Sequence, residues 1–160
     1  IFPTNLLWKN GKGETRYMNV ESLSDGGLAN GRMMGSGGFI VFDEDQCVVS
    51  HTYTLARFYR HESCGQCSPC REGTGWMETI LKNIEYGKGK MSDIVLLCDI
   101  QSKIEGNTIC PLGDAAAWPV AAAIRHFRDE FEWHVLNPDE SQQRNFGLAH
   151  YADELETVTA

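Results

Sequence analysis

The spacing of apolar residues divides the chain into an irregular first part and a helical second part. From about residue 46 to about residue 135, apolar residues recur every three or four positions, which is the spacing of one helix face. We predict four helices, over about residues 46–60, 72–86, 92–105 and 114–133. Because short connections between amphipathic helices favour antiparallel neighbours, the expected fold is mainly α, with a four-helix bundle at residues 46–135.

Glycine and proline positions refine these helices. Gly87 and Gly106 follow the second and third helices, where a glycine commonly ends a helix. Ser92 is the expected N-cap of the third helix, with Asp93 in its first turn. Pro119 lies inside the fourth helix and predicts a bend or a restart there. The core is expected to contain the large aromatic side chains Tyr53, Phe58, Tyr59, Trp76 and Trp118.

The regions before and after the bundle differ from it in pattern. Residues 1–45 contain turn clusters and a short apolar run, Phe39 to Phe42, that predicts a strand, so we expect part of a small α+β unit. Residues 136–160 are expected to form an acidic, exposed tail, because the last 26 residues contain five acidic residues and one basic residue. We therefore predict three parts, 1–45, 46–135 and 136–160.

Composition excludes several classes of protein. The 160 residues are 42% hydrophobic, which is enough to form a core. The formal net charge of −8 argues against a nucleic-acid-binding surface. No apolar run reaches the roughly 20 residues of a membrane span, so no direct membrane insertion is expected. The chain starts at Ile1 without an initiator Met or a visible signal peptide, and we expect it to be a piece of a longer protein.

Four of the six cysteines have the spacing of a metal centre. Cys64, Cys67 and Cys70 form a C-x2-C-x2-C run, and Cys110 follows 40 positions later, directly before Pro111. Zinc sites usually use two C-x2-C pairs, and the second pair is absent here. Three thiolates from one loop and a remote fourth suit a [4Fe–4S] cluster, which we favour over zinc and over disulfides.

The remaining candidate ligands receive simpler interpretations. Cys47 and Cys98 are expected to be small buried thiols, as free cysteines often are. His51, His126, His134 and His150 have no metal-ligand spacing, and we expect them on helix faces or in the tail. Arg71 and His61 flank the cysteine run and are candidates to stabilise an anionic cluster. No catalytic set is apparent, and a cluster with four cysteine ligands indicates electron transfer.

Two segments carry a resemblance to a known family. The run from His61 to Gly73, HESCGQCSPCREG, closely resembles the iron–sulfur signature of the NADH-binding flavoprotein subunit of respiratory complex I. The run from Thr108 to Val120, TICPLGDAAAWPV, resembles that family's fourth-ligand segment, and residues 35–44 are similar to the end of its β-grasp-type domain. The resemblance implies a [4Fe–4S] cluster on Cys64, Cys67, Cys70 and Cys110, and a β-grasp-like origin for residues 1–45.

The resemblance also implies a function. In that family, NADH reduces FMN in an N-terminal domain, and electrons then pass through this cluster towards quinone. No flavin or NADH residue can be assigned here, so the chain alone is expected to lack catalytic activity. The implied partners are the missing flavin domain and the peripheral-arm subunits of complex I. The implied place is the soluble arm, on the cytoplasmic side of a bacterial inner membrane or the mitochondrial matrix side.

Two alternatives remain open. The chain could belong to the diaphorase subunit of an NAD-reducing hydrogenase or formate dehydrogenase, because those relatives share this cluster module. It could instead be a zinc-stabilised helical bundle that docks a partner.

Overall fold

A computed structural model describes residues 8–9, 15–16, 40 and 46–141. The chain divides into two compact units, Phe2–Glu44 and Asp45–Ala160 with Ile1. In the smaller unit, β1 (Trp8–Lys9) pairs antiparallel with β2 (Thr15–Arg16). The strand predicted at residues 39–42 lies outside the described residues apart from Ile40, which has no regular structure. The predicted tail lies almost entirely outside them too.

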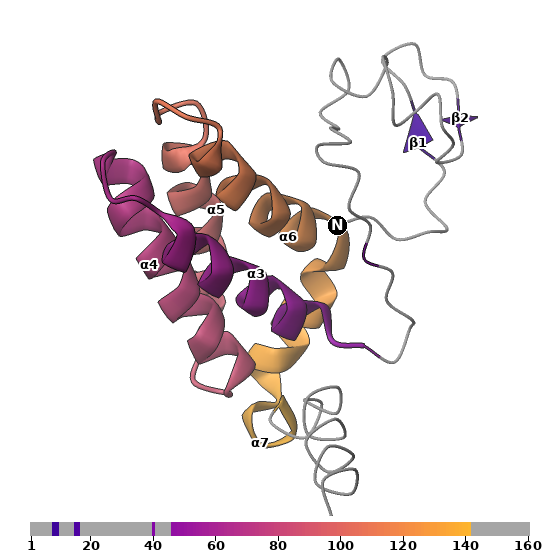
Figure 1. The fold of residues 1–160 in the computed structure, drawn as a ribbon. Coiled ribbons are helices and arrows are strands. Elements are labelled where there is room, and N and C mark those ends of the chain that lie inside the picture. Colours follow the sequence, from indigo (N-terminus) through magenta and orange to yellow (C-terminus); the bar gives the residue numbers. More distant parts are fainter. Residues whose placement is uncertain (1–7, 10–14, 17–39, 41–45, 142–160) are drawn as a thin grey trace, which may run out of the picture. The chain divides into compact units, whose positions relative to one another are not determined.

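The larger unit is a bundle of four helices, which confirms the predicted mainly α fold (Figure 1). The α3 helix packs against α4 and α6, and α5 packs against the same two helices. A short helix, α7, follows α6. The bounds are α3 Val48–Glu62, α4 Ser68–Glu85, α5 Met91–Ile104, α6 Leu112–Leu136 and α7 Pro138–Ser141.

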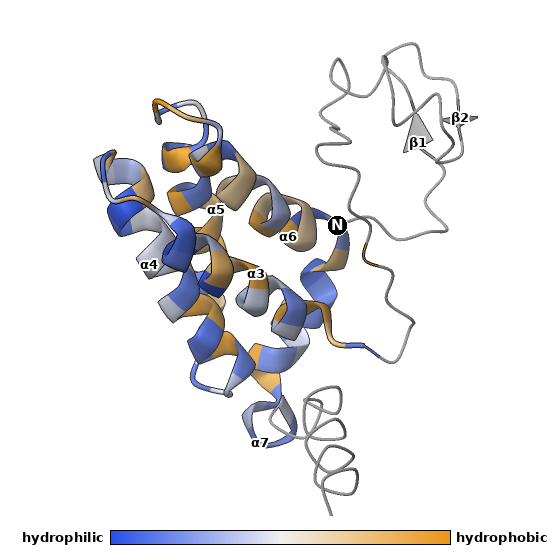
Figure 2. Ribbon diagram, viewed as in Figure 1, coloured by the Kyte–Doolittle hydropathy of each residue, from blue (hydrophilic) through white to orange (hydrophobic). Residues whose placement is uncertain are grey.

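The core is built from aliphatic side chains and small alanines. Each helix presents apolar and polar residues in turn, which Figure 2 shows as orange and blue segments along the same ribbon. Burying one large aliphatic side chain stabilises the fold by about 1.5–3 kcal/mol. Completely buried core residues include Val49, Met77, Leu81, Ile84, Ile94, Leu97, Ala117, Ala123 and Phe131.

The aromatic part of the predicted core is largely wrong. Phe58, Trp76 and Trp118 are 54%, 57% and 42% exposed. Tyr53 and Tyr59 are partly buried against the core, in line with the prediction. When the apolar face of a helix is broad, more than one stripe of residues can be buried. Because these helices pack closely, the smaller apolar side chains occupy the interface.

Three helices begin earlier than predicted: α4, α5 and, by two residues, α6. The α4 helix starts at Ser68, so its first turn includes Cys70 and has Pro69 where a missing N–H is harmless. The α5 helix starts after Lys90, and Ser92 is not its N-cap. The Asp93 carboxylate accepts a hydrogen bond of 2.9 Å from the Lys90 N–H, so an acidic residue in the first turn satisfies the helix start.

The helix does not restart at the predicted position, Pro119. The α6 helix continues through Pro119 and departs from helical dihedral angles at Phe127, where φ is −134° and ψ is 33°. Proline removes one hydrogen bond of the helix, and α6 packs against both α3 and α5, which supports the helix despite that loss. The kink at Phe127 precedes the two completely buried residues Phe131 and His134.

Gly73 sets how closely α4 approaches α5. A Cβ atom at Gly73 would lie 2.6 Å from the Ile104 Cδ1 atom, which belongs to a buried side chain. We therefore expect Gly73→Ala to lower the free energy of unfolding by about 1–3 kcal/mol in urea titrations. Gly75→Ala is the matched control, because a Cβ there would meet no atom closer than Arg60 Nε at 3.7 Å. That control should gain up to about 1 kcal/mol from helix propensity. Equal stability of the two variants would contradict this packing.

Candidate metal centre

Three of the candidate cysteines lie where α3 ends and α4 begins. The α3 helix ends at Glu62, and Cys67 is the N-cap of α4. Cys64 is exposed in the connection, Cys67 is partly buried, and Cys70 is buried in the first turn of α4. The three thiols, which lie within seven residues, therefore differ in solvent exposure. A short loop and the first turn of α4 position them.

Local hydrogen bonds hold this cysteine loop against α4. Gly65 has a φ of +78°, a left-handed conformation that glycine adopts without strain. The Arg71 guanidinium donates to the Gly65 carbonyl oxygen at 2.9 Å and to the Glu72 carboxylate at 2.8 Å. The Ser63 hydroxyl lies 3.2 Å from Cys70 Sγ and accepts a bond from the Gly65 N–H. Arg71 therefore holds the backbone of the cysteine loop against the start of α4.

The flanking histidine lies away from these contacts. His61 contacts the neighbouring Glu62 carboxylate at 3.0 Å, and its side chain is 85% exposed. The position of His61 therefore gives no support to its predicted role beside the cysteines.

The fourth cysteine lies in the connection between α5 and α6. The Ile109 N–H donates to Cys67 Sγ at 3.4 Å, which joins this connection to the cysteine loop across 42 residues of sequence. Cys110 is exposed and precedes Pro111, the N-cap of α6. Figure 1 shows the α3–α4 and α5–α6 connections at the same end of the bundle. The structure therefore brings the connection that contains Cys110 into contact with the three-cysteine run.

The α5–α6 connection is itself held in place. The Thr108 hydroxyl donates to the Cys110 carbonyl oxygen at 2.9 Å, and the Gly106 N–H donates to the Asp114 carboxylate at 2.7 Å. Gly113 has no room for a Cβ atom, because the Thr108 side chain occupies that space. These contacts fold the connection over the start of α6 and fix the backbone on both sides of Cys110.

Two helices direct their N-terminal ends to this region. The α4 helix begins after Cys67, and the α6 helix begins after Pro111. The unpaired N–H groups of a helix start carry a partial positive charge, which stabilises nearby anions. A cluster with four thiolate ligands is anionic, so this arrangement suits it.

The separation of the sulfur atoms also bears on the type of centre. Among the described residues, no three of the four thiols have sulfur atoms all within 4.8 Å of one another. A single tetrahedral zinc ion with Zn–S bonds of about 2.3 Å would hold its sulfur atoms about 4 Å apart. A cluster of four irons spaces its four thiolate ligands more widely. The separation of these thiols is compatible with a [4Fe–4S] cluster, in which each thiolate binds a different iron.

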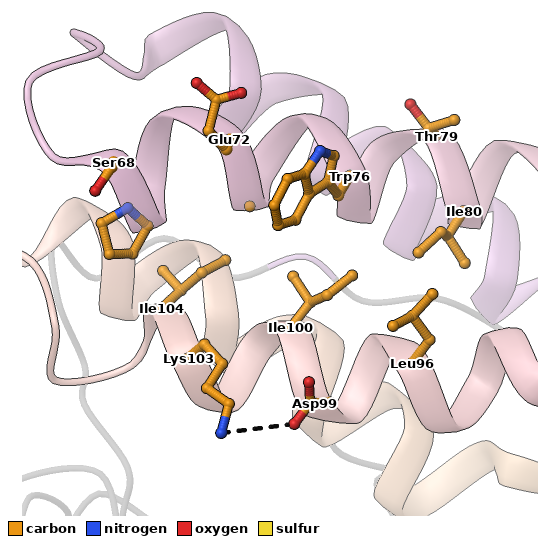
Figure 3. A pocket seen from close by; sticks show the side chains of 12 residues that line it. Ser68, Glu72, Trp76, Thr79, Ile80, Leu96, Asp99, Ile100, Lys103 and Ile104 are labelled. Carbon is orange, nitrogen blue, oxygen red and sulfur yellow. Dashed lines mark ion pairs between the residues drawn. The ribbon is translucent and has the colours of Figure 1, made fainter.

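A groove between α4 and α5 starts beside the cysteine loop. It has a volume of about 750 Å³, and Ser68 and Pro69 form the end next to the cysteines. Trp76 of α4 faces Ile100 of α5 across it in Figure 3. An ion pair of 3.7 Å between Lys103 and Asp99 lies at its rim. The lining contains neither cysteine nor histidine, so the groove offers a mainly apolar surface and no ligand set for a transition metal.

A second polar cluster, which the sequence did not predict, lies elsewhere in the bundle. The prediction that Cys47 is a buried thiol is confirmed, but Cys47 Sγ lies 3.2 Å from His134 Nε2. His134 is on a helix as expected, yet it is completely buried, and so is Glu85 beside it. Spacing could not reveal this cluster, because its members are 38 and 87 residues apart from Cys47. Cys98 is partly buried against the core, as predicted.

The chain matches one protein family over most of the bundle. A sequence model of the NADH-ubiquinone oxidoreductase-F iron-sulfur binding region matches residues 50–134. An NADH-quinone oxidoreductase subunit of Rickettsia typhi (strain ATCC VR-144 / Wilmington) is 47% identical over 119 residues, which are 74% of this chain and 26% of that relative. The corresponding protein of Rhizobium meliloti (strain 1021) is 45% identical over 108 residues, 68% of this chain and 25% of the relative.

A solved structure is also similar. The crystal structure of an NAD+-reducing [NiFe]-hydrogenase in the H2-reduced state matches with a TM-score of 0.57 and 34% identity. The match covers 59% of this chain and 16% of that one. Among the described residues, no helix is long and apolar enough to cross a membrane.

These comparisons agree with the cysteine geometry. The chain spans about a quarter of the length of the curated relatives it matches. The matched region includes the cysteine loop, the α5–α6 connection and most of α6. The resemblance drawn from the two cysteine segments is confirmed. The chain belongs to the family of NADH-ubiquinone oxidoreductase-F iron-sulfur binding regions, whose cofactor is a [4Fe–4S] cluster.

Proposed function

We propose that Cys64, Cys67, Cys70 and Cys110 hold the cluster, and that the chain relays single electrons within an NADH-oxidising enzyme. The observation that carries this proposal is the hydrogen bond from the Ile109 N–H to Cys67 Sγ. It joins the two cysteine-bearing connections at one end of the bundle. When bound, a [4Fe–4S] cluster with four thiolate ligands supplies one-electron transfer without an open iron site.

The residues of the chain position and tune this centre. Helix starts at Cys67 and Pro111 offer backbone N–H groups to an anionic ligand set. The Arg71 contact with the Gly65 carbonyl oxygen and the Thr108 contact with the Cys110 carbonyl oxygen hold both connections. A backbone held in this way moves little when charge changes, which favours fast electron transfer.

The rest of the proposed path lies outside this chain. We propose that NADH reduces FMN in a separate flavin domain, that the flavin passes electrons to this module, and that further clusters lead to quinone. The relatives, which are named as parts of NADH-quinone oxidoreductase, support this proposal. The proposed partners are the flavin domain and other peripheral-arm subunits of complex I. The proposed location is the soluble arm on the cytoplasmic or mitochondrial matrix side.

The predicted division of the chain remains part of this proposal. Residues 46–135 form the iron–sulfur module, residues 1–45 are the end of a β-grasp-like domain, and residues 136–160 are an acidic tail. The first boundary lies near the division of the chain into two compact units.

The NAD+-reducing hydrogenase similarity favours a second candidate, a diaphorase subunit that exchanges electrons between NAD and a hydrogenase. A formate dehydrogenase diaphorase is a related possibility. Affinity purification from the native host separates these candidates, because the co-purifying proteins would be quinone-reductase, hydrogenase or formate dehydrogenase subunits respectively.

The electron source provides a direct test. Anaerobically reconstituted chain should contain about four irons and four sulfides, and dithionite or photoreduced FMN should produce the EPR signal of a one-electron-reduced cluster. NADH alone should produce neither that signal nor NADH oxidation, because none of the family's flavin motifs occurs in this sequence. Zinc without iron and sulfide would contradict the relay and favour the docking bundle. NADH turnover by this chain would contradict its proposed role as a relay only.

A further inference from the structure

The buried cluster of Cys47, Glu85 and His134 lies far from the cysteine loop. Cys47 is the N-cap of α3, Glu85 is the last residue of α4, and His134 is near the end of α6. The α4 helix runs from Ser68 beside the cysteine loop to Glu85, a length of about 25 Å at 1.5 Å per residue. The cluster is therefore at the other end of α4 and plays no part in holding the iron–sulfur centre.

Its three side chains lie together, with Cys47 Sγ near the Nε2 atom of His134 and Glu85 Oε2 at 4.0 Å from the Nδ1 atom of the same ring. Cys47 Sγ lies 3.2 Å from His134 Nε2 and 3.9 Å from Glu85 Oε2. One ligand atom from each residue lies within 4.8 Å of the other two. A tetrahedral zinc ion with bonds of about 2.3 Å to sulfur and 2.0–2.1 Å to nitrogen places those two atoms about 3.5 Å apart. The observed S–N distance is 3.2 Å, and the S–O distance, for which tetrahedral zinc requires about the same separation, is 3.9 Å, so small side-chain movements would admit the ion.

The chemistry of the three groups favours zinc over other cations. Thiolate, imidazole and carboxylate are all common zinc ligands. Magnesium and calcium prefer sites made of oxygen atoms alone. All three side chains are buried, with exposed fractions of 7%, 1% and 0% for Cys47, Glu85 and His134. Such burial leaves no path for a substrate, so a bound metal would have a structural role.

Without a metal, the site keeps Cys47 protonated. Burial raises the pKa of Cys47 to about 12, and the negative charge of Glu85 adds to this effect. Glu130 also contributes, while its carboxylate accepts a 2.9 Å hydrogen bond from the Val48 N–H. A divalent cation reverses this preference, because one thiolate and one carboxylate balance its charge and the imidazole stays neutral. The thiol proton passes to solvent as the metal binds.

We propose that Cys47, Glu85 and His134 bind a structural zinc ion that ties the start of α3 to the ends of α4 and α6. Structural zinc sites usually have four protein ligands; this one has three, and a buried water molecule would be the fourth. The Ser50 N–H donates to Cys47 Sγ at 3.4 Å and would help to hold the thiolate. This site is independent of the iron–sulfur centre in position and in ligands.

X-ray absorption at the zinc edge tests the proposal directly. The full chain, with its [4Fe–4S] cluster assembled, is equilibrated with Zn²⁺, and excess zinc is then removed by gel filtration. We expect about one zinc per chain, coordinated by one sulfur and by nitrogen or oxygen atoms. Retention of no zinc would overturn the proposal. Zinc with three or four sulfur ligands would also overturn it, because that set belongs to the cysteine loop.

Variants give an independent readout. Cys47→Ser and Glu85→Gln should each reduce the bound zinc to near zero while the iron content stays unchanged. Cys98→Ser is the matched control, since Cys98 is partly buried in α5 and outside the cluster, and it should keep its zinc. Zinc should raise the melting temperature of the wild-type chain and of Cys98→Ser only. Full zinc retention by Cys47→Ser would contradict the site, and the absorption measurement decides the question if that variant does not fold.

Discussion

Cys67→Ser is expected to remove the iron–sulfur cluster. Cys67 is the middle ligand of the proposed run, the N-cap of α4, and the acceptor of the Ile109 N–H bond. Its loss leaves three thiolates and breaks the contact between the two connections. Iron and sulfide should fall from about four per chain to near zero after anaerobic purification, and the EPR signal after dithionite reduction should disappear.

The same substitution should also lower thermal stability, for a reason that can be isolated. The Cys67 side chain makes no capping hydrogen bond in α4, and serine is a favourable N-cap residue, so the change costs no capping and removes mainly the metal ligand. Circular dichroism should therefore show a lower melting temperature than that of the cluster-loaded chain. Cys98→Ser removes a thiol from α5 instead and should keep both the iron and the signal. An unchanged EPR signal in Cys67→Ser would exclude Cys67 from the ligand set.

Phe131→Ala is expected to cause the largest loss of stability among core substitutions. Among the residues that the structure describes, Phe131 is the largest completely buried side chain, and it lies on α6 beyond the irregular residue Phe127. Truncation of a buried phenylalanine costs about 3–5 kcal/mol, because apolar contacts are lost and a cavity remains. Small domains have only about 5–15 kcal/mol in total, so urea unfolding should show a much lower midpoint.

Phe58→Ala provides the matched control for that measurement. It removes the same atoms from a side chain that is 54% exposed. Phe58 makes an edge-on ring contact with Tyr59 at a centroid distance of 5.3 Å, and such contacts contribute about 0.5–1.5 kcal/mol. The midpoint should shift much less than in Phe131→Ala. Equal shifts in the two variants would contradict the buried position of Phe131.

The helices were predictable because their pattern is local. Apolar residues at helical spacing predicted four helices near the observed ones, and the positive φ values of Gly87 and Gly106 agree with glycines that end helices. Helix ends were less predictable. At Asp93 a side chain caps the helix two residues earlier than Ser92 would, and such competition between caps depends on how the chain enters the helix.

The apolar pattern did not determine which face of each helix is buried. Trp76 and Trp118 lie on helices with several apolar positions per turn, and either of two stripes could have faced inward. Which stripe is buried depends on the neighbouring helices, because Ala and Ile permit close packing where indole rings do not. Thus Trp76 faces the groove beside α5, half exposed.

The sequence by itself determined the helical class, the four thiols proposed as ligands and the family, because all three are written in local spacing. The C-x2-C-x2-C run and the remote Cys110 can be recognised from the sequence alone, because cluster ligands are cysteines at characteristic spacings. Only the tertiary structure decided that the Ile109 N–H meets Cys67, and that Cys47, Glu85 and His134 converge in the interior. Those contacts join residues 38 to 87 positions apart, and the packing of whole helices, which no local pattern encodes, brings them together.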